Sequence, residues 1–364
     1  MNTLGNDFQV SILGESHGDV VGVLVDGVPS GIPFDHTDVQ PALLRRRPGQ
    51  SDVTTPRDEG DVCTIDSGTK DGVTTGAPVL MLIHNEDVDS SKYHEFLTKP
   101  RPGHADLTAR ILFADRNDYR GGGMFSGRLT AGLVMAGSLA RKYLAQRGIE
   151  VAAHVRKVAD VEAPKLDTVE QIRENVEDNL VRCADPDAAE RMTEAIREAR
   201  DDEDSLGGIV QCIAEGLPPG LGEPLFQKVE GVVGHAMMSL PATKGVQFGQ
   251  GYDATEMRGS EHNDNWTYDE AGRIETAQND GGGVFGGITS GMPIRTEVIF
   301  KPPTSIGQPQ DTIDLETGED TSLTVEGRHD PCILPRAVPV VEATMACAIM
   351  DLFAMRRGRG HGGA

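Results

Sequence analysis

The stretch that decides the fold is ESHGDVVGVLVDGVPSGI, residues 15–32, because it occurs a second time in the chain. It aligns without gaps on DSLGGIVQCIAEGLPPGL, residues 204–221. Further on, GGGMFSG at 121–127 recurs as GGGVFGG at 281–287, in the same order. Internal self-similarity of this kind is the signature of a repeated structural unit, so we expect two similar halves related by a pseudo-twofold axis. The identical pairs of the long repeat are Ser16/Ser205, Gly18/Gly207, Val21/Val210, Gly27/Gly216, Pro29/Pro218 and Gly31/Gly220.

Each half is predicted to contain a strand, a turn, a helix, further strand and a second helix. Residues 20–25 and 209–214 read as buried strands, each ended by a Gly-Val-Pro or Gly-Leu-Pro turn. Residues 79–83 and 294–300 are further strand candidates. A helix follows the first triple glycine: Ser126 can cap it and Gly148 can stop it. Its apolar face would be formed by Leu129, Leu133, Ala136, Ala140 and Tyr143.

Strands flanked by helices within each half predict an α+β fold, a β-α-β sandwich, rather than a long alternating series. We expect one domain over residues 1–364, with halves at about 1–160 and 204–355. Residues 165–204 would form an exposed, acidic connector of two helices, and the tail at 356–364 is expected to be flexible. The acidic run of the connector is a solvated face or, as the alternative, a functional acidic patch. The apolar stretch 339–355 suits a buried helix.

The chain has 364 residues and a formal net charge of −23, from 57 acidic and 34 basic residues. That charge repels nucleic acid and anionic membrane, which makes both poor partners, and suggests a solvated, salt-adapted surface. No apolar run approaches the roughly 20 residues that a membrane helix needs. The N-terminus, MNTLGNDFQV, has no secretory signal, so a cytoplasmic protein is expected. The five scattered cysteines form no C-x-x-C pair, which predicts free thiols in a reducing compartment, and neither a metal site nor a disulfide.

Three histidines lie in segments that favour chemistry. His17, in GESHG, aligns with Leu206 in the second copy. Because an apolar residue is sufficient for the structure at that position of the second half, the sequence favours a proton donor at His17. A hydrogen-bonded structural histidine is the alternative. His104 lies in RPGHAD, where Asp106 could fix its tautomer. His329 lies beside Asp330 in GRHDP, a catalytic loop or an exposed turn whose aspartate caps the next segment.

Arginines near glycine-rich loops indicate an anion site. Guanidinium groups bind carboxylates and phosphates, and glycine loops that open helices present backbone N–H groups to the same anions. The alternative is a surface run satisfied by neighbouring acids. The loops fit neither G-x-G-x-x-G nor the P-loop pattern, so no familiar dinucleotide or nucleoside triphosphate fold is indicated. The KPPTS loop at 301–305 adds a lysine and two hydroxyls. The candidate contacts to an anionic substrate are Arg45, Arg47, Arg57, Arg120 and Arg128.

Together these segments resemble the chorismate synthase family over nearly the whole chain. Nine motifs occur in the family's order over about 320 residues, which makes the resemblance highly specific. They are GESHG at 14–18, DGVPSGIP at 26–33, RRRPGQS at 45–51, RPGHAD at 101–106, YRGGG at 119–123, MRGSEHND at 257–264, GGVFGGITSGMPI at 282–294, KPPTS at 301–305 and GRHDPC at 327–332.

The resemblance implies a lyase of the shikimate pathway to aromatic amino acids. The family removes phosphate from 5-enolpyruvylshikimate 3-phosphate together with a hydrogen from carbon 6, an anti-1,4-elimination that leaves chorismate. It requires reduced FMN although the reaction has no net redox change. Its fold is a β-α-β sandwich with internal pseudo-symmetry, and its usual assembly is a homotetramer.

The family's site residues can be carried onto matching positions. By similarity, His17 would protonate the departing phosphate, His104 would protonate or steady the reduced flavin, and Asp330 would accept the carbon 6 proton through flavin N5. Arg46 matches a residue assigned to NADPH in members that reduce their own flavin. The implied FMN contacts are Met124, Phe125, Ser126, Pro241, Ala242, Gly286, Lys301, Pro302, Pro303, Thr304, Ser305 and Arg328.

The chain departs from the family pattern at three positions. Many members have GGGRSSARET where this chain has GGGMFSGRLT. Met124 therefore replaces an arginine of the family, and Phe125 replaces a serine. Flavin contacts there must rely on backbone N–H groups and Ser126, or on Arg128. Asp52 stands where the family has a second arginine linked with nicotinamide binding. This replacement weakens the case for an intrinsic flavin reductase. The alternatives to the lyase are a flavin reductase or other nicotinamide-linked flavoprotein, and an inactive flavin- or anion-binding scaffold.

Overall fold

The computed structural model describes residues 2–49, 60–85, 90–325 and 330–358, and contains two five-stranded sheets with antiparallel neighbours. The first sheet has the strand order β1-β2-β3-β7-β4 and the second β11-β16-β10-β8-β9. The bounds in the first sheet are β1 Thr3–Leu4, β2 Gln9–Gly14, β3 Val20–Asp26, β4 Cys63–Ser67 and β7 Val79–His84. Those in the second sheet are β8 Glu150–Val158, β9 Val161–Glu162, β10 Gly208–Glu215, β11 Thr243–Phe248 and β16 Ile294–Phe300.

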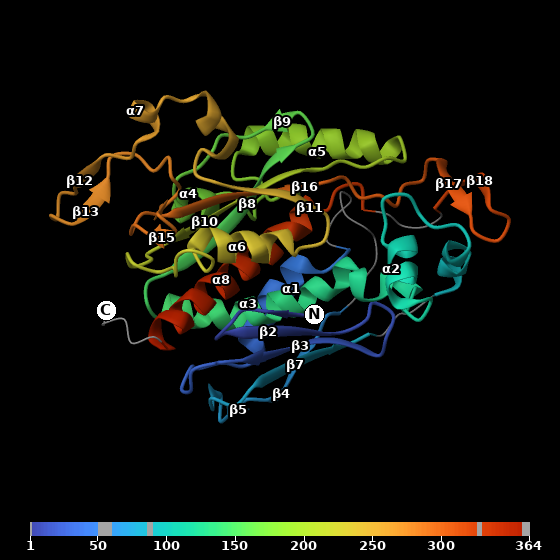
Figure 1. The fold of residues 1–364 in the computed structure, drawn as a ribbon, viewed down its shortest axis with the longest axis horizontal. Coiled ribbons are helices and arrows are strands. Elements are labelled where there is room, and N and C mark those ends of the chain that lie inside the picture. Colours follow the sequence, from blue (N-terminus) through green and yellow to red (C-terminus); the bar gives the residue numbers. More distant parts are fainter. Residues whose placement is uncertain (1, 50–59, 86–89, 326–329, 359–364) are drawn as a thin grey trace.

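A layer of helices lies between the two sheets (Figure 1). The layer consists of α1 His36–Arg46, α3 Thr130–Ala145, α6 Val229–Met238 and α8 Leu334–Gly358. α3 packs on the first sheet and on α8, and α8 packs on the second sheet. Gly137 allows this close approach, because a Cβ there would lie 2.3 Å from the Cβ of Ala343. The predicted β-α-β sandwich is confirmed.

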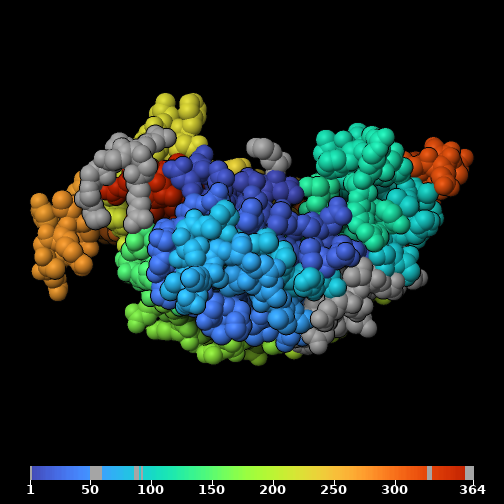
Figure 2. Space-filling model, turned by 90° about the horizontal axis from the view of Figure 1, so that it is seen from below, coloured from blue at the N-terminus to red at the C-terminus, as the bar shows by residue number. Residues whose placement is uncertain are grey.

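The remaining elements are short and lie around this core. The hairpins β12–β13 and β17–β18 project at opposite ends of the molecule (Figure 2). The hairpin bounds are β5 Thr69–Lys70 with β6 Val73–Thr74, β12 Trp266–Tyr268 with β13 Ile274–Thr276, β14 Val284–Phe285 with β15 Ile288–Thr289, and β17 Gln310–Asp314 with β18 Glu319–Leu323. The short helices are α2 Asp106–Phe113, α7 Gly259–His262 and the 3₁₀ helices η1 Ser91–Leu97, η2 Arg120–Phe125, η3 Gly127–Leu129 and η4 Gly251–Glu256.

The two halves share one order of elements. In the first, the central strand β3 is followed by α1, β4, β7 and α3; in the second, β10 is followed by α6, β11, β16 and α8. The turn after each central strand needs a glycine in the left-handed region, Gly27 with φ +75° and Gly216 with φ +77°. At both positions a Cβ would collide with a backbone carbonyl, at 1.8 and 2.1 Å. The match of 15–32 with 204–221 therefore joins equivalent positions of the fold.

Two details of the predicted duplication are wrong. The triple glycine at 121–123 lies between β7 and α3, whereas the one at 281–283 lies before β16, so the two loops are not counterparts. The first half was expected to end near 160, but β8 begins at Glu150 and pairs with β10 in the second sheet. The boundary between the two sheets therefore lies before residue 150.

The connector is less exposed than its charge suggests. It contains α4 Val169–Arg173 and α5 Pro186–Asp201, which cover the outer face of the second sheet (Figure 1). Because the second sheet has helices on both faces, α4 and α5 each need an apolar side as well as a charged one. Their buried side chains are Val169, Ile172, Ala188, Ala189, Met192 and Ile196.

Helix α8 begins five residues earlier than expected and contains Pro339. Proline has no N–H for the carbonyl four residues before it, that of Pro335. Arg182 Nη1 donates to that carbonyl instead, at 2.6 Å. Contrary to the expectation that no apolar run is long enough, residues 334–356 match a membrane span in length and hydropathy. However, 89% of the 18-residue apolar stretch within this segment is buried inside the protein. It is the core helix of the sandwich.

The last helix also holds the start of the chain. Asp351, buried in α8, accepts hydrogen bonds from the backbone N–H groups of Asn6, Asp7 and Phe8 at 2.8–3.0 Å. These residues form the turn between β1 and β2. The first sheet is therefore anchored to the C-terminal helix.

Candidate active site

A cavity of about 610 Å³ lies where the helical layer ends. The C-terminal end of α1 and the N-terminal ends of α3 and α8 reach its wall. Helix N-termini carry unpaired N–H groups and partial positive charge, which favours anions. Other parts of the wall come from η1, the triple-glycine loop and the KPPTS loop.

His17 lies in the wall between β2 and β3 and is 7% exposed. Its Nδ1 lies 2.9 Å from Ser90 Oγ, and its ring meets Tyr93 edge-on at 5.0 Å between centroids. The triple-glycine loop covers its other side, because a Cβ at Gly121 would lie 2.6 Å from Nε2. Ser90 therefore engages one ring nitrogen, while the other lies toward the glycine loop.

His104 lies in the same wall and contacts Ser305, with 3.0 Å between Nε2 and Oγ. Asp106, the expected partner of His104, instead accepts hydrogen bonds from Arg101 through both carboxylate oxygens at 2.8 Å. Burial alone would raise the pKa of Asp106, but the hydrogen bonds and charge of Arg101 outweigh it and lower that pKa. Arg101 also lies over the Phe96 ring, 4.4 Å from its centroid.

Asp330 is the third predicted proton-handling group in the wall. Arg336, from the first turns of α8, donates to its Oδ2 at 2.5 Å. Arg336 Nε donates to the Arg46 carbonyl oxygen at 3.1 Å. The base of α8 therefore fixes both the carboxylate and the end of α1.

Two arginines of the cavity share one buried carboxylate. Arg46 and Arg128 both pair with Asp61, whose side chain has no exposed surface. Arg46 is 2% exposed and also donates to the backbone carbonyl of Arg128 at 3.2 Å. Two guanidinium groups against one carboxylate leave this side of the cavity net positive.

The KPPTS loop supplies a further cation. Lys301 Nζ donates to the Gly103 carbonyl at 2.8 Å. Burial and the charge of Lys244 lower the pKa of Lys301. Two lysines that face the same cavity favour an anion between them.

The structure brings most of the predicted residues together. Those in the cavity wall are His17, Arg46, His104, Phe125, Ser126, Arg128, Pro241, Ala242, Lys301, Pro302, Pro303, Thr304, Ser305 and Asp330. Arg57 and Arg328 lie outside the described residues, as do Asp52 and His329. Five predicted residues are not part of the wall: Arg45, Arg47, Arg120, Met124 and Gly286.

The positions of three of these five have a clear reason. Arg45 is turned toward Glu342 and Glu177, with which it forms ion pairs at 2.6 Å. Arg120 pairs with Asp118 at 2.7 Å. Gly286 lies in the β14–β15 hairpin, on the second half. For Arg45, the alternative interpretation of the arginine run is therefore correct: its charge is paired with neighbouring acidic side chains.

Several wall residues escaped the sequence analysis. Asn85 follows strand β7, and Tyr93 and Phe96 belong to η1. A polar residue directly after a buried strand was an available signal for Asn85. Arg336 lies at the start of an apolar helix, where a lone arginine is a comparable signal.

Comparisons with known proteins show the family of this chain. The chain matches the family model described as chorismate synthase over residues 8–354. It is 49% identical to proteins named chorismate synthase from Methanopyrus kandleri, over 96% of this chain and 92% of the relative, and from Korarchaeum cryptofilum, over 98% of both. A solved structure titled "Crystal Structure of Chorismate Synthase" superposes with a TM-score of 0.77 at 27% identity, covering 98% of this chain and 94% of that one. This chain therefore belongs to the chorismate synthase family.

Proposed function

We propose that this protein eliminates phosphate from 5-enolpyruvylshikimate 3-phosphate to form chorismate, as a carbon–oxygen lyase. The observation that carries the proposal is the convergence of His17, His104 and Asp330 on one cavity, although they lie in three distant parts of the chain. Elimination across a ring requires an acid for the leaving group and a base for the departing proton. The three side chains offer two imidazoles and a carboxylate.

The cavity suits a substrate with several negative charges. Arg46, Arg128, Lys301 and Arg336 line it, while Asp61 and Asp330 supply the opposing charge. As the carbon–oxygen bond breaks, negative charge accumulates on the leaving phosphate. Fixed cations stabilise that transition state more than the ground state, in which the bridging oxygen of the ester carries no charge.

We assign His17 as the donor of a proton to the leaving phosphate. Its Nδ1 lies 2.9 Å from Ser90 Oγ and its Nε2 lies beside Gly121, and we assign the transfer to Nε2. Asp330, oriented by Arg336, accepts the proton lost from carbon 6. His104, in contact with Ser305, steadies the reduced form of the cofactor.

The residues of the cavity also fit a flavin mononucleotide. The volume of the cavity lies in the range of roughly 300–1,000 Å³ that is usual for cofactor pockets. Leu240, Pro241 and Ala242 offer an apolar wall, while Lys301 and the hydroxyls of the KPPTS loop suit a phosphate. Reduced FMN would supply electron density that helps the phosphate leave, without net redox change.

We propose that the flavin is reduced by an outside source such as NADPH and a separate reductase. Arg46, the residue matched to nicotinamide binding, is buried against Asp61 and backbone carbonyls. A flavin reductase as the main activity has no support in the matched family or in the relatives described above.

We also propose a cytoplasmic homotetramer. Large apolar side chains are exposed on projecting segments, and patches of this kind mark interfaces between proteins. They include Leu225, Phe226, Tyr252, Trp266 and Tyr268, exposed by 59–90%. Light scattering coupled to gel filtration measures the assembly; a monomer at micromolar concentration would contradict the tetramer.

The decisive experiment is an anaerobic assay with chemically reduced FMN and the enolpyruvyl ester. Chorismate and inorganic phosphate should appear in equal amounts, and no product should form with oxidised FMN. Oxidation of NADPH by added FMN without release of phosphate would instead identify a reductase. Flavin binding with neither product would identify an inactive scaffold.

A further inference from the structure

The loop that carries His17 is held by one side chain from a neighbouring strand. Asn85 follows the last residue of β7, and its Nδ2 donates toward the carbonyl oxygens of Gly18 at 2.8 Å, Ser16 at 3.2 Å and Glu15 at 3.5 Å. These carbonyls lie on both sides of His17. The Asn85 backbone N–H also donates to the Asp19 carbonyl, at 3.0 Å.

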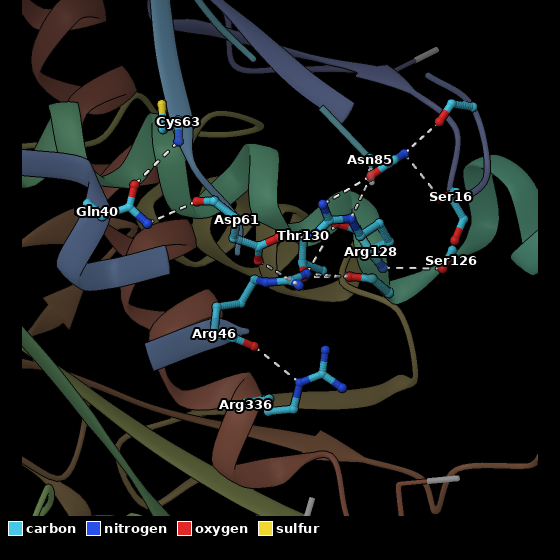
Figure 3. A network of polar contacts seen from close by, with 12 residues as sticks. Ser16, Gln40, Arg46, Asp61, Cys63, Asn85, Ser126, Arg128, Thr130 and Arg336 are labelled. Carbon is cyan, nitrogen blue, oxygen red and sulfur yellow. Dashed lines mark hydrogen bonds and ion pairs between the residues drawn. The ribbon is translucent and has the colours of Figure 1, made fainter. Parts of the chain in front are cut away.

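The orientation of the Asn85 amide is fixed from the other side. Arg128 donates from Nε and Nη2 to Asn85 Oδ1, at 3.2 and 3.0 Å. Arg128 Nη1 in turn pairs with Asp61, which also pairs with Arg46 (Figure 3). Since a guanidinium group only donates, Oδ1 must face Arg128 and the NH₂ group must face the loop.

We propose that Asn85, oriented by Arg128 and Asp61, is a positioning residue that places the imidazole of His17 for proton transfer. This inference rests on the proposed function for the role of His17. It also revises the role of Arg128, which was expected to contact substrate. Its Nε and Nη2 donate to Asn85, its Nη1 donates to Asp61, and its side chain is 8% exposed.

Asparagine is the side chain that this position requires. It supplies an acceptor to the guanidinium and donors to the loop carbonyls at the same time. Aspartate has a similar shape and would still accept from Arg128. It would, however, present a second acceptor oxygen to carbonyls that need a donor.

The contact geometry predicts a loss in kcat rather than in substrate binding. His17 must lie within hydrogen-bond distance of the atom it protonates, and a displacement of about 1 Å can cost about 100-fold in rate. The cationic wall that we propose binds the substrate also includes Lys301 and Arg336, which come from the KPPTS loop and α8 rather than from the segments that bond to Asn85. KM for the ester should therefore change much less than kcat.

The test compares Asn85→Ala with Asn179→Ala. Asn179 is a matched control: its Nδ2 donates to the carbonyls of Asn175 and Cys183, its Oδ1 accepts from the Cys183 N–H, and it does not line the cavity. We expect Asn85→Ala to lower kcat by about 10- to 100-fold with KM within about threefold, and Asn179→Ala to change neither to that extent. Equal losses in the two variants would overturn the proposal.

A double-mutant cycle separates positioning from general destabilisation. If Asn85 acts through His17, Asn85→Ala should lower the residual rate of a His17→Ala variant by less than about threefold. A full additive loss in that background would overturn the proposal. If Asn85→Ala does not fold, Asn85→Asp keeps the volume and the contact with Arg128, and the same outcomes apply.

A spectroscopic readout does not depend on turnover. In protein labelled with ¹⁵N-histidine, the His17 ring signals are those missing from His17→Ala. Asn85→Ala should shift these signals and their titration, whereas Asn179→Ala should not; unchanged His17 signals in Asn85→Ala would overturn the proposal. If the wild-type protein does not turn over the ester, the proposed function fails, and the ring signals still decide whether Asn85 positions His17.

Discussion

Gly121 lies against the imidazole of His17 so closely that no side chain fits between them. A Cβ at position 121 would lie 2.3 Å from Cδ2 and 2.6 Å from Nε2 of His17. Gly121 also has φ +59°, in the left-handed region that side chains disfavour. The triple-glycine loop therefore serves as one wall of the histidine site.

Replacing Gly121 by alanine should displace the His17 ring. We expect kcat to fall by about 100-fold, since a small displacement of a catalytic group has that effect, while the folded state survives. The control is Gly148→Ala, because Gly148 has a similar φ of +71°, its Cβ position meets open space and it does not line the cavity. Steady-state kinetics with reduced FMN measure both. Wild-type kcat in Gly121→Ala would show that the ring need not stay where the structure places it.

Removing the imidazole itself should have a larger effect. His17→Ala is expected to lower kcat by about 10²–10⁴, the range for loss of one general acid, and to leave flavin binding largely intact. Fluorescence titration with FMN measures the binding. His235→Ala, an exposed position on α6, serves as the control. Turnover equal to the wild type would remove His17 from the mechanism.

Arg45 is expected to act in stability rather than in substrate binding. Its partner Glu342 is buried and also accepts from Arg141 and from the Ala153 N–H. Arg45→Met would leave Arg141 and the Ala153 N–H beside that carboxylate, so we expect a loss above about 1 kcal/mol but below the roughly 3–5 kcal/mol of a fully unpaired buried charge. Urea denaturation should show this loss. Arg273→Met, which breaks an exposed pair with Asp269, should cost under about 1 kcal/mol. Equal small losses would mean that Glu342 is well solvated.

The same carboxylate gives a pH dependence of stability. Burial alone would raise the pKa of Glu342, but the charges of Arg45 and Arg141 outweigh it, and the pKa is lowered. Its contribution is therefore fully present above the unfolded pKa of about 4.3 and is lost as the pH falls through the lower folded value.

In Arg45→Met the pKa of Glu342 should rise, so the loss should begin at a higher pH than in the wild type. Denaturation midpoints between about pH 3 and pH 7 measure the difference. The double variant Arg45→Met/Glu342→Gln should lack this added dependence. Parallel curves for the wild type and Arg45→Met would contradict the assignment.

The cysteines should be inert in the folded protein. Burial raises the pKa of Cys183 to about 11 and of Cys63, Cys332 and Cys347 to about 12, and that of Cys212 also lies above its usual value. The thiolate is the reactive form, so a disulfide reagent such as DTNB should modify the native chain slowly and all five thiols after unfolding. Rapid labelling of one thiol in the native state would identify an opening that the structure does not show.

Local pattern was sufficient for the central strands and for helix α3. Strands β3, β7, β10 and β16 were predicted within one or two residues, because a buried run with a glycine–proline turn at one end leaves little choice of structure. The prediction failed where long-range packing decides. α8 starts at Leu334 because Arg182, from a distant loop, satisfies the carbonyl that Pro339 leaves open.

The candidate site divides in the same way. His17, His104 and the triple-glycine loop at 121–123 are visible in the sequence, and all three contribute to the cavity wall. The direction in which an arginine points is not visible. Arg45 and Arg46 are neighbours on α1, yet Arg45 turns to Glu342 and Arg46 to Asp61, because adjacent residues of a helix point about 100° apart. Asn85 was missed because its role depends on three carbonyls that are remote in the sequence.

The grip of Asp351 on residues 6–8 has a consequence for how the protein is made. The backbone N–H groups of the turn at the start of the first sheet donate to Asp351 of α8, 343–345 residues further along the chain. The first sheet therefore cannot reach its finished form during translation until residue 351 has emerged from the ribosome.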